Sequence, residues 1–173
     1  MDNKTEILKA RAKALAREPD TAGASSERIE VLEFVLAYER YGIESQFVRE
    51  VYPLKALTPV PCTPPFVLGI INVRGRILSV IDIKTFFELP EQGLAELSQA
   101  VVIRDDAMEF AILADSIVGF RFVSTGDILP SLPTLTGIRQ DYLKGITKDR
   151  MVILDARKLL SEKALVVHED VQN

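Results

Sequence analysis

The sequence predicts a mainly β protein made of two small β-barrel subdomains, with one helix near each end. Short apolar runs, bounded by turn residues, fill the chain from residue 28 onward, and such runs are typical of strands. The runs form a weak repeat, in which each copy has too few residues for a large core of its own. The two longest helix-forming patterns cover residues 5–18 and 156–165.

The first predicted element is an amphipathic helix over residues 5–18. Good helix formers surround a narrow apolar stripe, while charged residues occupy the other faces; the stripe consists of Ile7, Leu8, Ala12 and Leu15. Residues 19–26 are small and polar, which indicates a linker.

Strand patterns fill the first half of the remaining chain. Residues 29–38 and 41–45 are apolar runs on either side of the turn candidate Glu39-Arg40, and residues 47–52 add a further run. Five prolines between residues 53 and 65 exclude a central strand there, because each proline lacks a ladder donor. A hairpin is then expected from residues 69–72 and 76–83, with Gly75 supplying the turn conformation.

The second half repeats this arrangement. Hairpins are expected around Asp105-Asp106 and Lys148-Asp149, and the last strand leads into the helix at residues 156–165. Asp82 and Asp155 occupy equivalent places, each after an apolar strand and before helix-like residues. We therefore predict that both cap a helix, rather than form a catalytic pair of carboxylates.

These patterns divide the chain into three parts. Residues 1–27 hold the N-terminal helix and linker, residues 28–165 form the globular domain, and residues 166–173 form a polar tail. Within the domain, we expect the subdomains to cover roughly residues 28–95 and 96–165.

Composition argues against several classes of protein. The 173 residues carry a formal net charge of -4, which is unfavourable for binding nucleic acid. A single Cys and a single His, His168 in the tail, cannot build a zinc site or a hydrolase triad. We therefore expect no catalytic residue, no metal and no cofactor, and we expect Cys62 to be a small apolar filler rather than a reactive thiol.

Localisation follows from the same counts. A lone Cys cannot form a disulfide within the chain, which fits a reducing compartment. No apolar run approaches the roughly 18 residues of a membrane span, and the N-terminus lacks the pattern of a signal peptide. The sequence predicts a cytoplasmic protein without membrane insertion.

Three consecutive motifs resemble the chemotaxis coupling proteins of the CheW family. They are G-I-I-N-V-R-G-R-I-L-S-V-I-D-I at residues 69–83, Y-G-I-E-S-Q-F-V-R-E-V at residues 41–51 and V-P-C-T-P-P-F-V-L-G at residues 60–69. The resemblance extends over roughly residues 30–165. Ser79 and Ile83 depart from the family's usual Pro and Leu, but they leave the signature recognisable.

The resemblance implies a fold and a function. The fold is two five-stranded SH3-like barrels with a helix near the C-terminus. The function is that of a non-enzymatic adaptor, which joins the cytoplasmic tips of chemoreceptors to the regulatory domain of the CheA histidine kinase. Such a protein is cytoplasmic and is recruited to membrane-associated receptor arrays.

The resemblance also carries site residues over to this sequence. It implies a receptor-binding groove that takes a helical receptor tip and includes Val48, Gly69, Asn72, Arg74 and Gly75. We expect Glu50 and Arg74 to pair beside this groove and to couple it to the kinase-facing surface. The alternative is a surface ion pair worth about 0–1 kcal/mol that has no signalling role.

The expected kinase contact is a barrel docked against a similar barrel. Val51 and Leu54 are candidates for this surface, although each fits the core equally well.

Three other functions stay open. The same fold could serve a non-flagellar chemosensory pathway, such as pilus-based motility. A small β-barrel that binds a ligand or single-stranded nucleic acid is disfavoured by the net charge, by 7% aromatic residues and by the lack of Trp. An enzyme that uses Cys62 would need a base beside a perturbed thiol.

Overall fold

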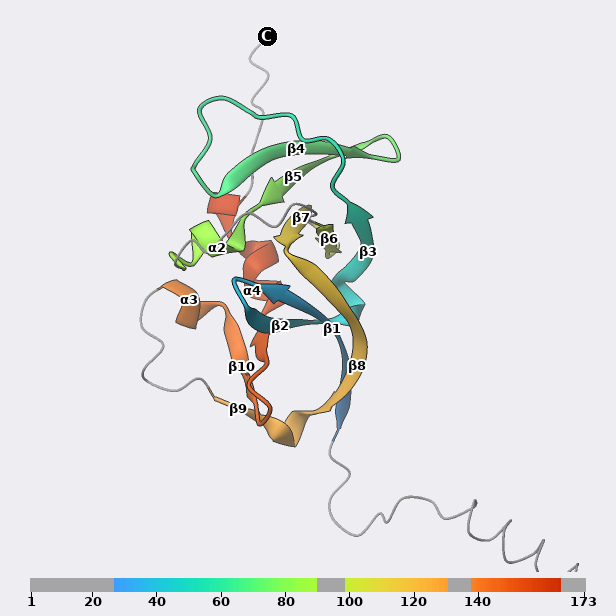
Figure 1. Ribbon diagram of the computed structural model, residues 1–173, viewed down its shortest axis with the longest axis vertical. Helices are drawn as coiled ribbons and strands as arrows, with labels where there is room; N and C mark the ends of the chain where they lie inside the picture. The colour runs from blue at the N-terminus through green and yellow to red at the C-terminus, as the bar shows by residue number, and fades with distance from the viewer. Residues whose placement is uncertain (1–26, 90–98, 131–137, 166–173) are drawn as a thin grey trace, which may run out of the picture.

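Two β-sheets form most of the protein in a computed structural model that describes residues 27–89, 99–130 and 138–165 (Figure 1). Sheet A has six strands in the order β8-β1-β2-β11-β10-β9, and sheet B has five in the order β3-β6-β7-β5-β4. The predicted mainly β fold of two small subdomains is confirmed. Sheet A has one strand more than the resemblance implied, and the predicted N-terminal helix lies outside the described residues.

The elements have the following bounds. Sheet A contains Arg28–Leu36 (β1), Glu39–Glu44 (β2), Ser116–Ser124 (β8), Ile128–Leu129 (β9), Leu143–Thr147 (β10) and Val152–Leu154 (β11). Sheet B contains Val48–Pro53 (β3), Val67–Val73 (β4), Arg76–Ile81 (β5), Gln99–Arg104 (β6) and Glu109–Ala114 (β7). The α-helices are Ile83–Phe86 (α2), Ile138–Asp141 (α3) and Ala156–Ser161 (α4), and the 3-10 turns are Ser45–Phe47 (η1), Thr125–Asp127 (η2) and Lys163–Leu165 (η3).

The two sheets do not follow the two halves of the chain. Sheet B uses one continuous stretch, from β3 to β7, whereas sheet A joins β1 and β2 to the four strands that come after β7. β1 pairs antiparallel with β8, and β2 pairs parallel with β11. The predicted boundary at residues 95 and 96 therefore does not separate the sheets, because these long-range pairings override the order of the repeat.

The predicted hairpins are present. β4 pairs with β5, β6 with β7 and β10 with β11, each antiparallel. β1 and β2 also form a hairpin, but its turn is Ala37-Tyr38, with φ of 49° and 66°. The predicted turn at Glu39-Arg40 was wrong, because the chain already turns at Ala37-Tyr38 and β2 begins at Glu39. Two positive φ values suit a tight hairpin, since they match the right-handed twist of the flanking strands.

The proline-rich crossing runs close to β4. Thr58 exchanges two backbone hydrogen bonds with Ile70, at 3.0 and 2.8 Å. Gly69 is buried beneath this contact, at φ +152°, and a Cβ there would lie 2.3 Å from the Thr58 carbonyl oxygen. In the same crossing Cys62 is exposed at φ 62°, so the prediction of an apolar filler was wrong: the chain turns outward at this residue.

Three apolar clusters hold the sheets together. The largest lies between the sheets and includes Phe34, Ile103 and Leu159 of α4. A second cluster lies on one face of sheet B around Val80 and Val102, and a third lies on one face of sheet A around Val31, Val123, Met151 and Ile153. Each sheet thus curls around a small interior of its own and shares its other face with its neighbour.

Both predicted caps are confirmed. The Lys84 N–H donates to Asp82 at the start of α2, at 2.9 Å, and the Lys158 N–H donates to Asp155 at the start of α4, at 3.2 Å. Helix α4 ends at Ser161, earlier than predicted, and η3 follows it.

Candidate partner-binding site

The β4–β5 hairpin presents an ordered, charged tip. Arg74 and Gly75 form its two-residue turn at φ 52° and 83°, a pair of positive values that glycine tolerates and that tight hairpins require. The Gly75 N–H donates to the Asn72 side-chain oxygen at 2.8 Å. This bond fixes the turn, and the Arg74 side chain is 82% exposed at its tip.

A bulge in β3 places the side chains of Val48 and Glu50 on different faces of sheet B. Val48 pairs with Ile103 and Glu50 pairs with Val102, so two residues of β3 oppose one step of β6. The extra residue sends the two side chains to opposite faces of the sheet. Val48 is half-buried against the core between the sheets, whereas Glu50 shares the face of Val102 in the interior of sheet B.

Glu50 belongs to a network of charges at the start of β5. Arg76 donates to Glu50 at 2.8 Å and also to Glu109 of β7. Arg49 lies 3.3 Å from Glu109, and Arg74 lies 3.7 Å from Glu50. The hydrogen bond to Glu109 is the main reason why the pKa of Arg76 is raised. Arg76 therefore ties three strands of sheet B together.

The structure brings together part of the predicted receptor site. Asn72, Arg74 and Gly75 share the hairpin, and the Glu50–Arg74 contact is present. Gly69 is buried under Thr58 and offers no surface, while Val48 faces the core on the other side of β3. Arg76 and Glu109 escaped the sequence reasoning, although the second arginine of the R-G-R motif was a usable signal.

The two kinase-contact candidates are half-buried. Val51 packs against the core between the sheets, and Leu54 packs against the interior cluster of sheet B. Each side chain therefore contributes to packing and keeps some exposed surface.

A second charged network lies in sheet A. Glu33, 4% exposed, lies 3.2 Å from Arg40 and 3.3 Å from Arg121, and Arg121 lies 3.0 Å from Asp149. The pKa of Asp149 is lowered to about 2, first by the Thr147 hydroxyl that donates to it and then by Arg121. Each sheet thus has a network of paired arginines and carboxylates on the same face as its small apolar cluster.

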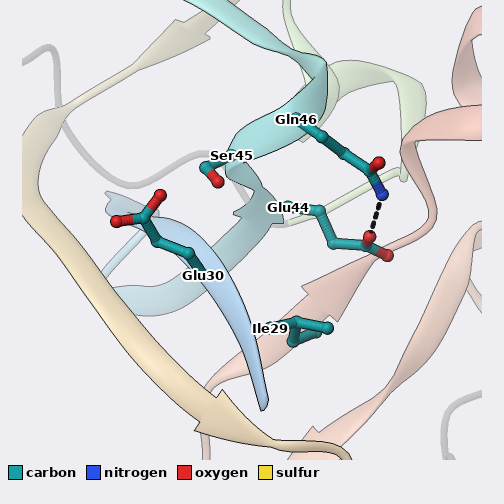
Figure 2. Close-up of a pocket in the computed structure, with 5 residues that line it drawn as sticks. All are labelled: Ile29, Glu30, Glu44, Ser45 and Gln46. Carbon is teal, nitrogen blue, oxygen red and sulfur yellow. Dashed lines mark hydrogen bonds between the residues drawn. The ribbon is translucent and has the colours of Figure 1, made fainter. Parts of the chain in front are cut away.

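A shallow hollow of about 220 Å³ lies away from the hairpin, beside the start of β1. Its lining residues are Ile29, Glu30, Glu44, Ser45 and Gln46 (Figure 2). Figure 2 shows the Gln46 amide bonded to Glu44, while the Glu30 carboxylate extends in the opposite direction. Only five residues line this hollow, and none of them is a nucleophile paired with a base.

Among the described residues, no group of three His, Cys, Asp or Glu side chains is arranged to hold a metal ion. None of their helices is both long enough and apolar enough to cross a membrane.

The fold and the candidate site together define a class of protein: a β protein of two SH3-like subdomains with a charged, ordered hairpin. A family model described as CheW-like domain matches residues 30–164. This match covers most of the sequence, so the chain belongs to the CheW-like domain family, as the motifs predicted.

Individual proteins agree with the family. Chemotaxis protein CheW of Treponema pallidum is 30% identical over 148 residues, which is 82% of this chain and 87% of that protein. Protein FrzA of Myxococcus xanthus is 32% identical over 133 residues, which is 75% of this chain and 82% of that protein. The crystal structure of the scaffolding protein TtCheW from Thermoanaerobacter tengcongensis matches with a TM-score of 0.66 at 29% identity, over 74% of this chain and 89% of that one.

Proposed function

We propose that this protein is a non-enzymatic chemotaxis scaffold, which couples the cytoplasmic tips of chemoreceptors to a CheA-type histidine kinase. The match of residues 30–164 to the CheW-like domain carries this proposal. The protein would act in the cytoplasm, at membrane-associated receptor arrays. It would need no cofactor or metal, and it would bind neither nucleic acid nor the membrane itself.

The hairpin supports a receptor-binding role for this part of sheet B. Its turn is fixed by the bond from Gly75 to Asn72, so Arg74 is presented without a large loss of backbone entropy on binding. A guanidinium group offers several donors to carboxylates and carbonyls of a partner helix. Val48 and Gly69 would contribute indirectly: Val48 packs β3 against the core between the sheets, and Gly69 lets the proline-rich crossing lie close to β4.

The Glu50–Arg74 pair is the proposed link within the site. At 3.7 Å, with Arg74 82% exposed, the contact is loose, so Glu50 would bias the Arg74 side chain rather than lock it. Arg76 holds Glu50 more closely, at 2.8 Å. We therefore assign the coupling role to the trio of Glu50, Arg74 and Arg76.

The kinase surface would use the exposed parts of Val51 and Leu54, which lie on β3 and just after it. Contacts of this size are individually weak, and arrays of many copies strengthen them.

A reconstitution experiment tests the adaptor role. A purified receptor cytoplasmic fragment and a CheA-type kinase are sedimented together, with and without this protein. We expect the kinase to sediment with the receptor when the protein is present and to stay in solution when it is absent. Failure of the folded protein to bind either partner would overturn the proposal.

The relatives include proteins named CheW and also FrzA. A scaffold in a chemosensory pathway other than flagellar chemotaxis is therefore the second candidate function. The same sedimentation with receptors and kinases from each pathway of the host would distinguish the two candidates.

A further inference from the structure

Strand β8 carries large apolar side chains on its outer surface. Val118 is 60% exposed, Phe120 57% and Phe122 67%, and we call these three residues the β8 stripe. Arg121 lies between Phe120 and Phe122 and Val123 follows Phe122, and both of these side chains point toward the interior of sheet A. Single exposed apolar residues are normal, but a contiguous row of this kind marks an interaction surface.

The stripe lies beside the point where the N-terminal segment joins the domain. β8 is an edge strand of sheet A and pairs with β1, the first strand of the domain (Figure 1). Arg28 pairs with Ser124, and Glu30 pairs with Phe122. Residues 1–26 are therefore attached next to one end of the stripe.

We propose that the β8 stripe is a docking surface for residues 5–18 of the same chain. The sequence predicts a helix there with an apolar side formed by Ile7, Leu8, Ala12 and Leu15. An isolated helix of this length is marginal in water, and packing of its apolar side is what would stabilise it.

The lengths of the two partners agree. In a helix, the apolar side from Ile7 to Leu15 would span about 12 Å, and the strand from Val118 to Phe122 spans about 13 Å. Residues 19–27 can bridge up to about 30 Å when extended, so the segment can turn back along β8 without strain.

Charge also favours this occupant. Residues 1–18 contain five Lys or Arg and three Asp or Glu, a formal charge of +2, while the whole chain carries -4. The rest of the protein therefore has a formal charge of -6. Glu30 is exposed opposite Phe122, which places a carboxylate beside the stripe for Lys9, Arg11 or Lys13 to approach.

Hydrogen exchange of the full chain tests the proposal. We expect the amides of residues 7–16 to exchange at least about tenfold more slowly than an unstructured segment would. The double variant Phe120→Ser/Phe122→Ser should restore the unstructured rate. Ile77→Ser, which removes an apolar side chain of similar exposure (61%) from sheet B, should leave the protection unchanged.

A second double variant changes the docking segment instead of the stripe, so that lost protection is not mistaken for unfolding of the domain. The double variant Leu8→Ser/Leu15→Ser changes no residue of the described sheets, and it should abolish the same protection while the sheet amides keep theirs. Unstructured rates in the wild type, or protection that survives both double variants, would overturn the proposal. Protection that rises with protein concentration would assign the stripe to a second copy and would likewise overturn it. None of these measurements involves a receptor or kinase, so the outcome is independent of the proposed function.

Discussion

Glu50 accepts a hydrogen bond from Arg76 at 2.8 Å, although the family signature draws attention to Arg74. The two arginines flank Gly75 and differ greatly in environment: the Arg76 side chain is 28% exposed and that of Arg74 is 82% exposed. One arginine closes the interior of sheet B, and the other is available to a partner. We therefore expect stability to depend on Arg76 and, under the proposed function, partner binding to depend on Arg74.

Stability should depend on Arg76 and not on Arg74. Arg76→Ala removes the closest partner of both Glu50 and Glu109 and the cation that lies between these two carboxylates, so the midpoint of urea unfolding should fall. Arg74→Ala removes one loose surface contact and should leave the midpoint unchanged. Equal midpoints for the two variants would contradict the assignment of Arg76 as the structural member.

Gly69→Ala should be strongly destabilising, because the added Cβ would lie 2.3 Å from the Thr58 carbonyl oxygen. Gly119→Ala is the matched control: its φ is +140°, but its Cβ would meet no atom within 4 Å. We expect backbone strain of about 1 kcal/mol in the control and an additional loss of about 2 kcal/mol in Gly69→Ala, for which the crossing must move. Urea unfolding of both variants measures the difference, and equal losses would show that the crossing yields freely.

Asp149 should make stability depend on pH at the acid end. Its pKa is lowered to about 2 from an ordinary value of 3.8, so the folded state holds the charged form more strongly than the unfolded state does. This contribution is complete above about pH 4 and is lost as the pH falls toward 2. Because the side chain is 44% exposed, solvent screening limits the contribution to less than about 1 kcal/mol.

Asp149→Asn should therefore be less stable than the wild type at pH 7, and the difference should shrink to near zero by pH 2. Unfolding by urea across this range measures the effect. A difference that stays constant with pH would show that the carboxylate charge contributes nothing.

The cap at Asp155 should contribute measurably to α4. Asp155→Ala removes the acceptor of the Lys158 N–H and should cost about 1 kcal/mol of stability. Asp155→Asn keeps a capping oxygen and should recover most of that loss. If the alanine and asparagine variants unfold at the same urea concentration, the side chain does not act as a cap.

Local patterns predicted the hairpins and both caps because these features depend on neighbouring residues. Turn residues, alternating apolar runs and an Asp before a helix act over a few positions. The turn at Ala37-Tyr38 escaped prediction because neither residue is typical of positive φ, whereas Glu39 and Arg40 fit a polar turn by composition alone.

Non-local relationships could not be predicted from these patterns. The pairing of β1 with β8 joins residues about ninety positions apart, and no local signal specifies it. The bulge between Val48 and Glu50 likewise depends on the register with β6. For this reason the motif supplied candidate residues for the site but did not show which of them are buried.

Under the proposed function, this protein binds a receptor through the exposed tip of the β4–β5 hairpin. The most direct measurement compares Arg74→Ala with Arg150→Ala, which replaces an exposed arginine at φ 65° in the β10–β11 turn. Both variants lose the same charge from the same kind of backbone. Titration against a receptor cytoplasmic fragment and against the kinase regulatory domain should show receptor affinity reduced about tenfold by Arg74→Ala alone, with kinase affinity unchanged. Receptor affinity that both variants leave unchanged, or weaken equally, would contradict the claim.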